Sequence, residues 1–195
     1  MILVVSATKA EIARASADGC EILVTGIGPV EAAAHVARAL ARSAYELVVS
    51  AGVAGAYDRD LEIGSGVVVA QETLELNAEN GDALSLPAER SLVQHATSDV
   101  DCVNRLVARG FRSVRGVTSA RVTATDATAQ RMLSLGAQIE SMEGFAVLRA
   151  AALAGVPAVE VRGISNYACE RSRSQWDFAA GVRGLAAVLR AVLER

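Results

Sequence analysis

Two acidic residues and one amide stand out because each is expected where a strand ends or a helix begins. Glu11 follows the apolar segment 2–7, Glu143 opens an apolar helical segment, and Asn166 ends the segment EVRGISN (160–166). Ligands of open α/β sheets bind beyond the carboxyl ends of the strands, so these side chains are expected to gather at one sheet edge. Two carboxylates and an amide at one site can take up a proton and stabilise charge that develops in a reaction.

Each of these residues also has an ordinary structural explanation. A glutamate at a helix start, like Glu143, commonly interacts with the helix dipole, and an asparagine such as Asn166 commonly sits in its own turn. Glycines such as those of GIGPVE (26–31) are commonly turns, and this segment lacks the third glycine of the dinucleotide-binding fingerprint. The combination, rather than any one residue, therefore indicates a functional site.

The elements that must position these residues alternate in type along the chain. Strands are expected at 2–7, 21–28, 45–56, 64–76, 111–120, 137–142 and 157–166, helices at 29–44, 88–97, 100–109, 126–136, 143–155 and 176–195, a turn and short helix or loop at 8–15, and a loop at 77–87. This alternation predicts an α/β fold with a largely parallel sheet. No internal repeat or Pro/Ser-rich linker divides the sequence, so residues 1–195 are expected to form a single domain.

The composition excludes several classes of protein. The sequence is 52% hydrophobic and 21% charged, which is typical of a well-packed globular chain. A net charge of -3 gives no electrostatic basis for binding nucleic acid or an anionic membrane, and no apolar run reaches the length of a spanning helix. The N-terminus opens directly on a strand-like segment without a targeting signal, and Cys20, Cys102 and Cys169 are dispersed. These features favour a cytoplasmic protein with reduced thiols.

Four segments resemble, in their order and spacing, the purine nucleoside phosphorylase and methylthioadenosine/S-adenosylhomocysteine nucleosidase superfamily. They are TGIGPVEAA (25–33), SAGVAGA (50–56), IESMEGFAVLRAA (139–151) and VRGISN (161–166). The strand-end ISN and the segment RSRSQW (171–176) are similar to those of the futalosine hydrolases. The resemblance spans essentially the whole chain. It implies a three-layer α/β/α fold around a mixed, partly closed central sheet, and a homo-oligomer built from dimers.

The resemblance also implies cleavage of the N-glycosidic bond of a purine nucleoside, with no metal and no organic cofactor. By position, Glu11 matches the acidic residue that activates the attacking water, and Glu143 matches the glutamate that holds the ribose hydroxyls. Asn166 matches the side chain that faces N7 of the base. Such cleavage passes through an oxocarbenium-like sugar and a departing purine, so a carboxylate beside the sugar and a donor beside the base are the groups it needs.

The expected substrate-binding residues surround these three. Met142 matches a residue that packs beside the sugar, Arg162 supports the strand end that carries Asn166, and the bend that approaches the ribose and water comprises Gly52, Val53, Ala54 and Gly55. Val53 stands where nucleosidases often carry serine, so only a backbone contact is available there. The segment TATDATAQ (123–130) stands where the superfamily places base-stacking residues, and it offers only small polar and alanine side chains for that purpose.

The nucleophile and the base can be argued from charge and hydrogen bonding. Lys9 is the only cation in the two segments where bacterial purine phosphorylases carry phosphate-binding arginines, and Glu11 would repel phosphate, so water is the expected nucleophile. Hypoxanthine presents acceptors at both N7 and O6, to which the amide of Asn166 can donate, whereas adenine suits a protonated aspartic acid. The amide therefore favours a 6-oxopurine nucleoside.

The leading hypothesis is hydrolysis of futalosine to hypoxanthine and dehypoxanthinyl futalosine, a step of menaquinone biosynthesis. A methylthioadenosine/S-adenosylhomocysteine nucleosidase, a 6-oxopurine nucleoside phosphorylase and a catalytically silent nucleoside-binding protein remain alternatives. The non-purine arm of futalosine carries a carboxylate, which Arg171 or Arg173 can meet, although both are equally consistent with solvated loop arginines.

Overall fold

The computed structural model describes residues 1–13, 19–77 and 92–194. In these ranges eight strands form one sheet: β1 (Ile2–Ser6), β2 (Cys20–Val24), β3 (Leu47–Ala56), β4 (Gly66–Leu74), β5 (His95–Thr97), β6 (Arg112–Thr118), β7 (Ile139–Ser141) and β8 (Ala158–Tyr167). The helices of the same ranges are α1 (Pro29–Leu40), α2 (Val100–Ala108), α3 (Asp126–Ser134), α4 (Gly144–Leu153) and α5 (Phe178–Leu193). Strands and helices alternate through most of the chain, as the sequence pattern predicts.

The sheet is mixed and closes partly on itself. Its strand order is β2-β1-β3-β7-β6-β4-β5, and β8 pairs with both β3 and β4. The pairs β3–β7, β7–β6, β6–β4, β4–β8 and β8–β3 therefore form a ring, while β1 and β2 extend the sheet beyond it. Most pairs are parallel, and β3–β7, β4–β5 and β4–β8 are antiparallel. The expected partly closed sheet is confirmed.

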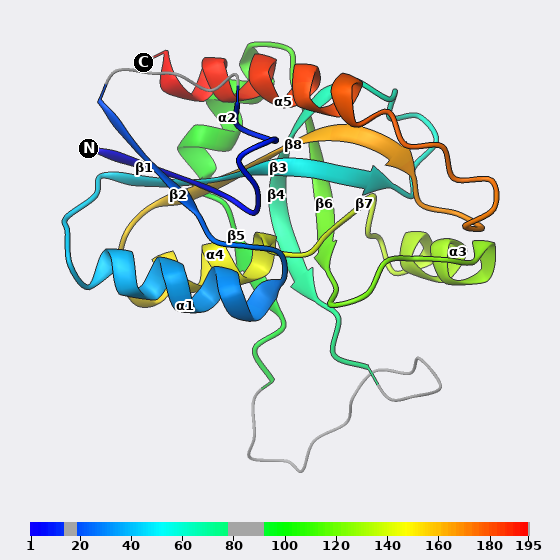
Figure 1. Cartoon of the computed structure of the whole chain (residues 1–195), viewed down its shortest axis with the longest axis horizontal. Coiled ribbons are helices and arrows are strands. Elements are labelled where there is room, and N and C mark those ends of the chain that lie inside the picture. The colour runs from blue at the N-terminus through cyan, green and yellow to red at the C-terminus, as the bar shows by residue number, and fades with distance from the viewer. Residues whose placement is uncertain (14–18, 78–91, 195) are drawn as a thin grey trace.

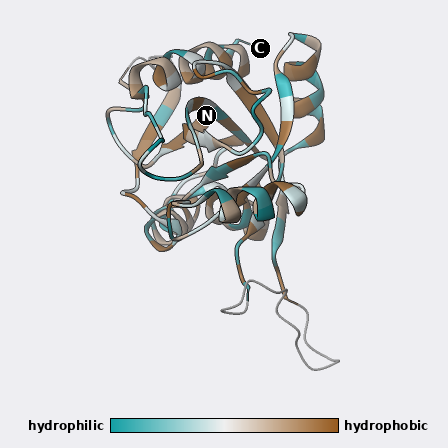
Figure 2. Ribbon diagram, turned by 90° about the vertical axis from the view of Figure 1, so that its right-hand side faces the viewer, coloured by the Kyte–Doolittle hydropathy of each residue, from teal (hydrophilic) through white to brown (hydrophobic). Residues whose placement is uncertain are grey.

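Helices cover both faces of this sheet (Figure 1). On β1, Ile2 and Val4 pack into a core shared with α2 and α5, while Leu3 and Val5 pack into a second core shared with α1 and α4. Successive side chains of a strand point to opposite faces, so an uninterrupted apolar run is what a strand between two helix layers requires. Figure 2 shows hydrophobic residues along the strands between these layers. The three-layer α/β/α architecture is confirmed.

The contact between α5 and the sheet depends on glycine. A Cβ atom placed on Gly163 of β8 would lie 1.9 Å from the carbonyl oxygen of Gly181 in α5, and one on Gly66 of β4 would lie 2.5 Å from that of Gly184. Backbone therefore meets backbone where α5 crosses β4 and β8. This close approach brings the N-terminal end of α5, at Phe178, beside the carboxyl end of β8.

The structure corrects one expected element and shortens others. The helix expected at 88–97 is wrong in its second half, because His95–Thr97 forms β5 and pairs antiparallel with β4; residues 88–91 lie outside the described residues. Most of the expected loop at 77–87, and residues 14–15 of the expected turn, also lie outside them. The helix expected at 29–44 ends at Leu40, and the strand expected at 21–28 ends at Val24. Both predictions were too long because the sequence pattern of each element continues into the turn that follows it. None of the helices in the described ranges combines the length and apolarity needed to cross a membrane.

Candidate active site

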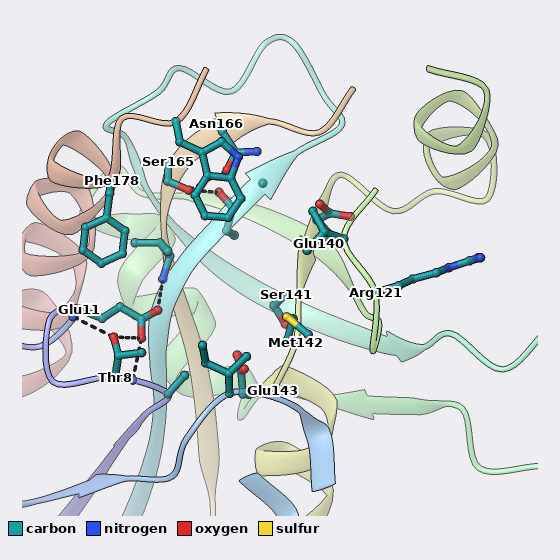
Figure 3. Close-up of a pocket in the computed structure, with 17 residues that line it drawn as sticks. Thr8, Glu11, Arg121, Glu140, Ser141, Met142, Glu143, Ser165, Asn166 and Phe178 are labelled. Carbon is teal, nitrogen blue, oxygen red and sulfur yellow. Dashed lines mark hydrogen bonds between the residues drawn. The ribbon is translucent and has the colours of Figure 1, made fainter. Parts of the chain in front are cut away.

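A cavity of about 180 Å³ lies at the carboxyl ends of β1, β3, β7 and β8. It is lined by three glutamates, an amide, an arginine and a set of apolar and small side chains (Figure 3): Ala7, Thr8, Glu11, Ile27, Val53, Ala54, Gly55, Arg121, Val122, Glu140, Ser141, Met142, Glu143, Ser165, Asn166, Trp176 and Phe178. Of the nine residues expected at the site, seven line this cavity. The other two, Gly52 and Arg162, lie beneath it.

Glu11 is buried and held by four donors. Its Oε2 accepts hydrogen bonds from the Thr8 backbone N–H (2.9 Å), the Thr8 hydroxyl (2.9 Å) and the Ser6 hydroxyl (3.2 Å), and its Oε1 accepts one from the Val53 N–H (3.0 Å). A Cβ at Gly52 would lie 2.9 Å from Oε1, so glycine there makes room for the carboxylate. Each carboxylate oxygen accepts about two hydrogen bonds, so Oε1 keeps a lone pair for a ligand.

Glu143 stands at the N-cap of α4 and lines the cavity. Its Oε1 accepts from the backbone N–H of Gly28 (2.9 Å), and its Oε2 lies 3.9 Å from Nη1 of Arg162. Gly28 precedes α1 with a φ of 107°, a conformation that L side chains rarely adopt. Burial raises the pKa of the Glu143 carboxyl, and the charge of Arg162 and the Gly28 hydrogen bond oppose that rise.

Asn166 enters the cavity because β8 contains a β-bulge. The register of β3 against β8 runs from Ala54↔Ile164 to Gly55↔Asn166, so Ser165 is an extra residue in β8. Consecutive residues of a regular strand point to opposite faces, and a bulge re-aims a side chain. Both Ser165 and Asn166 consequently line the cavity. The Ser165 hydroxyl lies 2.8 Å from Oδ1 of Asn166 and 3.2 Å from the Ala54 carbonyl oxygen; donation to the nearer oxygen, Oδ1, leaves the amide NH₂ for a ligand.

The remaining expected residues form the walls and floor. Val53 donates its backbone N–H to Glu11 Oε1, and Met142 lines the cavity between Ser141 and Glu143. Gly55 lies against Asn166, since a Cβ there would be 3.2 Å from Nδ2. Below them Arg162 is 2% exposed and bonds Glu160 Oε1 through Nε (2.7 Å). Burial alone would lower the pKa of Arg162, but the charges of Glu160 and Glu143 hold it above its usual value.

Glu140 is a cavity residue that the sequence pattern did not single out. Its Oε2 accepts from the Tyr57 hydroxyl (2.7 Å) and more weakly from the Thr123 N–H (3.3 Å). Burial and the nearby carboxylate raise the pKa of Tyr57, so its hydroxyl stays a donor. A Cβ on Gly55 would lie 3.2 Å from both Glu140 Oε1 and the Asn166 amide nitrogen, which places these two polar groups around one position.

Two aromatic side chains were also missed. Trp176 and Phe178 line the cavity on either side of Asp177. Asp177 caps α5 by accepting from the Ala180 N–H (2.8 Å), and its own N–H donates to the Ser165 carbonyl (2.8 Å). The cap therefore ties both rings to the bulge. The sequence signal that could have indicated these two residues is an aspartate between two aromatic residues, in a chain with only 4% aromatic residues.

The segments expected to stack on the base or to bind an anion lie elsewhere. No residue of 123–130 lines the cavity; Thr123 bonds Tyr57, and Thr125 caps α3. Lys9 is exposed and outside the lining. Arg173 is ion-paired with Asp126, whereas the Arg171 guanidinium lies 5.4 Å from the centre of the Trp176 ring.

Comparison with known proteins shows the family to which the chain belongs. The family model of the phosphorylase superfamily matches residues 6–194. A futalosine hydrolase of Streptomyces coelicolor is 38% identical over 179 residues, which cover 86% of this chain and 76% of that protein. A futalosine hydrolase of Thermus thermophilus is 33% identical over 183 residues, covering 90% and 81%. The chain belongs to the phosphorylase superfamily, in the futalosine hydrolase family.

The fold of this phosphorylase superfamily member matches solved structures even where the sequences have diverged. The 5'-methylthioadenosine/S-adenosylhomocysteine nucleosidase of Helicobacter pylori superposes with a TM-score of 0.83 at 16% identity, over 99% of this chain and 97% of that one. The expected superfamily is confirmed by the family model, and the expected fold by this superposition.

Proposed function

We propose that this protein is an N-glycosyl hydrolase that cleaves futalosine with water, giving hypoxanthine and dehypoxanthinyl futalosine as a step of menaquinone biosynthesis. The observation that carries the proposal is that Glu11, Glu143 and Asn166, from three distant segments, line one cavity with a free acceptor or donor on each. The futalosine hydrolases at 33–38% identity support the choice of substrate.

Glu143 stabilises the sugar as the bond to the base breaks. Positive charge develops on the ribose in the transition state, and a preorganised carboxylate in a buried site interacts with that charge more strongly than water does. Oε1 of Glu143 is fixed by Gly28, and among the described residues Oε2 has a 3.9 Å contact with Arg162, so Oε2 is available to the ribose hydroxyls. Met142 beside it packs against the sugar.

Glu11 activates water rather than phosphate. Its Oε1 has one lone pair left, which can accept a proton from a water in the cavity. Phosphate would enter a cavity with three carboxylates, Glu11, Glu140 and Glu143. Among the lining residues Arg121 is the one lysine or arginine, and its guanidinium is already paired with Glu75. These charges favour a neutral nucleophile.

Asn166 and Glu140 together read a 6-oxopurine. The Asn166 NH₂ donates to N7 and O6 of hypoxanthine, which both accept. A 6-oxopurine also carries a proton on N1, and Oε1 of Glu140, close to the same Gly55, can accept it. Adenine has an acceptor at N1 and a donor at its 6-amino group, so it opposes both residues. Phe178 and Trp176 supply apolar surface for the rings of the substrate.

The test is base release from purified protein given futalosine, inosine, methylthioadenosine or S-adenosylhomocysteine, each with and without phosphate. Hypoxanthine released from futalosine without phosphate is the expected result. Adenine release with no activity on futalosine would make it a methylthioadenosine/S-adenosylhomocysteine nucleosidase. A strict phosphate requirement would make it a 6-oxopurine phosphorylase.

A catalytically silent nucleoside-binding protein is separated by one variant. Glu143→Gln keeps the shape of the side chain and removes the charge, so an enzyme loses about 10²-fold or more of its turnover while it still folds. The matched control is Glu62→Gln, which makes the same change at an exposed glutamate. Wild-type protein that binds futalosine without releasing base would support the silent alternative.

We also propose that the protein is cytoplasmic, consists of one domain over residues 1–195 and forms a homo-oligomer built from dimers. Ile27, Val122 and Trp176 line the cavity yet are 63%, 42% and 50% exposed, and Val30 on α1 is 77% exposed. Apolar surface of this kind at the edge of a site fits a second copy covering it. Sedimentation velocity checks the proposal, and a monomer at all concentrations would contradict it.

A further inference from the structure

Beneath the cavity lies a cluster of buried charges, and Glu143 is the member of it that the proposed reaction uses. Glu72 of β4 and Glu160 of β8 are fully buried, and Arg162 is 2% exposed. Arg162 donates through Nε to Glu160 Oε1 (2.7 Å) and through Nη2 to the Ser50 hydroxyl (3.2 Å), and its Nη1 lies 3.9 Å from Glu143 Oε2. Two carboxylates thus flank one guanidinium, and the charge of Glu72 also acts on it.

Glycines on two other elements make room for the two deep carboxyls. A Cβ on Gly116 of β6 would lie 2.2 Å from Glu72 Oε1, and a Cβ on Gly144 at the start of α4 would lie 2.4 Å from both carboxylate oxygens of Glu160. Any side chain at either glycine would displace the acid opposite it. Glu72 and Glu160 therefore occupy space that the glycines of two separate elements, β6 and α4, leave open.

Among the described residues, hydrogen bonding leaves one carboxylate oxygen of this acid pair without a donor. Oε2 of Glu160 is buried and receives no hydrogen bond from any N–H or from any hydroxyl among the described residues. Glu72 already accepts from the Thr118 hydroxyl (3.0 Å) and weakly from the Ser141 hydroxyl (3.5 Å). The Ser141 hydroxyl also accepts from the backbone N–H of Gly144 (3.2 Å), the glycine that lies against the Glu160 carboxylate, so the two acids are neighbours. Two carboxylates hydrogen-bond to each other only if one carries a proton.

We propose that Glu72 and Glu160 share one proton as positioning residues, and that this acid pair holds Arg162 back from a close ion pair with Glu143. Glu72 supplies the proton and Glu160 accepts it on Oε2, which leaves Oε1 of Glu160 for Nε of Arg162. Arg162 is then anchored 3.9 Å from Glu143, and the Glu143 carboxylate stays available to the cavity.

The charges around Glu72 agree with this assignment. Burial holds the pKa of Glu72 well above its usual range, and the charge of Glu160 raises it further, while Arg162 acts in the opposite direction. With Glu72 neutral, Arg162 faces two carboxylates rather than three. The inference rests on the proposed function only where it assigns Glu143 to the sugar.

The proton itself can be detected without any substrate. Infrared spectra of the wild type should contain the C=O stretch of a protonated carboxyl at neutral pH, and this band should be absent from Glu72→Gln. The exposed Glu62→Gln is the matched control and should keep it. A spectrum in which Glu72→Gln removes no such band overturns the proposal, whatever the substrate of the enzyme is.

Kinetics test the positioning. Glutamine at position 72 still offers a donor to Glu160, so Glu72→Gln should keep kcat within about twofold, whereas Glu160→Gln should lower kcat by about tenfold or more because Arg162 turns to Glu143. Should Glu160→Gln fail to fold, Arg162→Lys replaces it: the charge remains but the Nε donor is lost, and kcat should again fall by about tenfold.

Two kinetic results would overturn the proposal. If kcat falls as far in Glu72→Gln as in Glu160→Gln, an ionised Glu72 pairs with Arg162. Glu160→Gln, or Arg162→Lys in its place, with wild-type kcat would mean that neither residue positions Glu143. Failure of the proposed function gives a different result, because wild-type protein would then release no hypoxanthine from futalosine while the infrared band of Glu72 is unaffected.

Discussion

Replacing Asn166 by aspartate should weaken cleavage of 6-oxopurine nucleosides far more than a loss of one contact suggests. Asn166 is 3% exposed, and the Ser165 hydroxyl fixes its Oδ1, so Nδ2 is the atom that meets the base. Asn166→Asp puts an oxygen there, facing the acceptors N7 and O6. A buried polar mismatch costs about 1–3 kcal/mol. That cost corresponds to about 5- to 150-fold in kcat/KM.

The assay compares kcat/KM for a 6-oxopurine and a 6-aminopurine nucleoside in the same buffer. The preference ratio should fall in Asn166→Asp, and most at low pH, where the new carboxyl is protonated and can donate to N7. Asn104→Asp makes the same change on the exposed face of α2 and should leave the ratio unaltered. Equal ratios for the two variants would refute the assignment of the Asn166 amide to the base.

Three further predictions follow from the same geometry. Ser165→Ala frees the amide of Asn166 to rotate, so kcat/KM should fall by about fivefold, the value of one hydrogen bond, with little change in the urea midpoint of unfolding. As the pH falls, activity should disappear before the pH reaches about 4.3, the ordinary glutamate pKa, because Glu143 must be ionised and burial raises its pKa. Since ionised Glu143 is disfavoured in the folded state, Glu143→Gln should also raise the melting temperature at neutral pH. Gly163→Ala should lower the free energy of unfolding by about 3 kcal/mol or more, measured in urea, because its Cβ would lie 1.9 Å from the Gly181 carbonyl oxygen.

The alternation of apolar and helical patterns was sufficient to predict most of the fold, because strands buried on both faces and amphipathic helices leave strong local signals. The three-residue strand β5 leaves none: it exists because His95 pairs with Thr73 of β4, a contact between distant segments. The helix expected at 88–97 failed there for that reason.

The site was predictable in part for a similar reason. Glu11, Glu143 and Asn166 stand at the ends of elements, where an α/β sheet collects its ligands, and all three line the cavity. Glu140 lies within β7, and its orientation toward Asn166 depends on the ring of strands. Phe178 reaches the cavity because Asp177, the N-cap residue of α5, donates its N–H to the Ser165 carbonyl in the bulge. No local sequence pattern indicates this contact between distant segments.

The carboxylates and the amide of the cavity share one arrangement: the protein forms hydrogen bonds mainly to one polar atom of the side chain and leaves the other polar atom for the ligand. Oε2 of Glu11 takes three donors and Oε1 one; Oε2 of Glu140 takes two, and no hydrogen bond is found at its Oε1 among the described residues. Glu143 is anchored through Oε1, and Asn166 through Oδ1. A side chain held this way has little rotational freedom to lose when the substrate binds. The orientation of the amide is therefore set by Ser165, so the extra residue that creates the bulge also decides which atom of Asn166 reads the base.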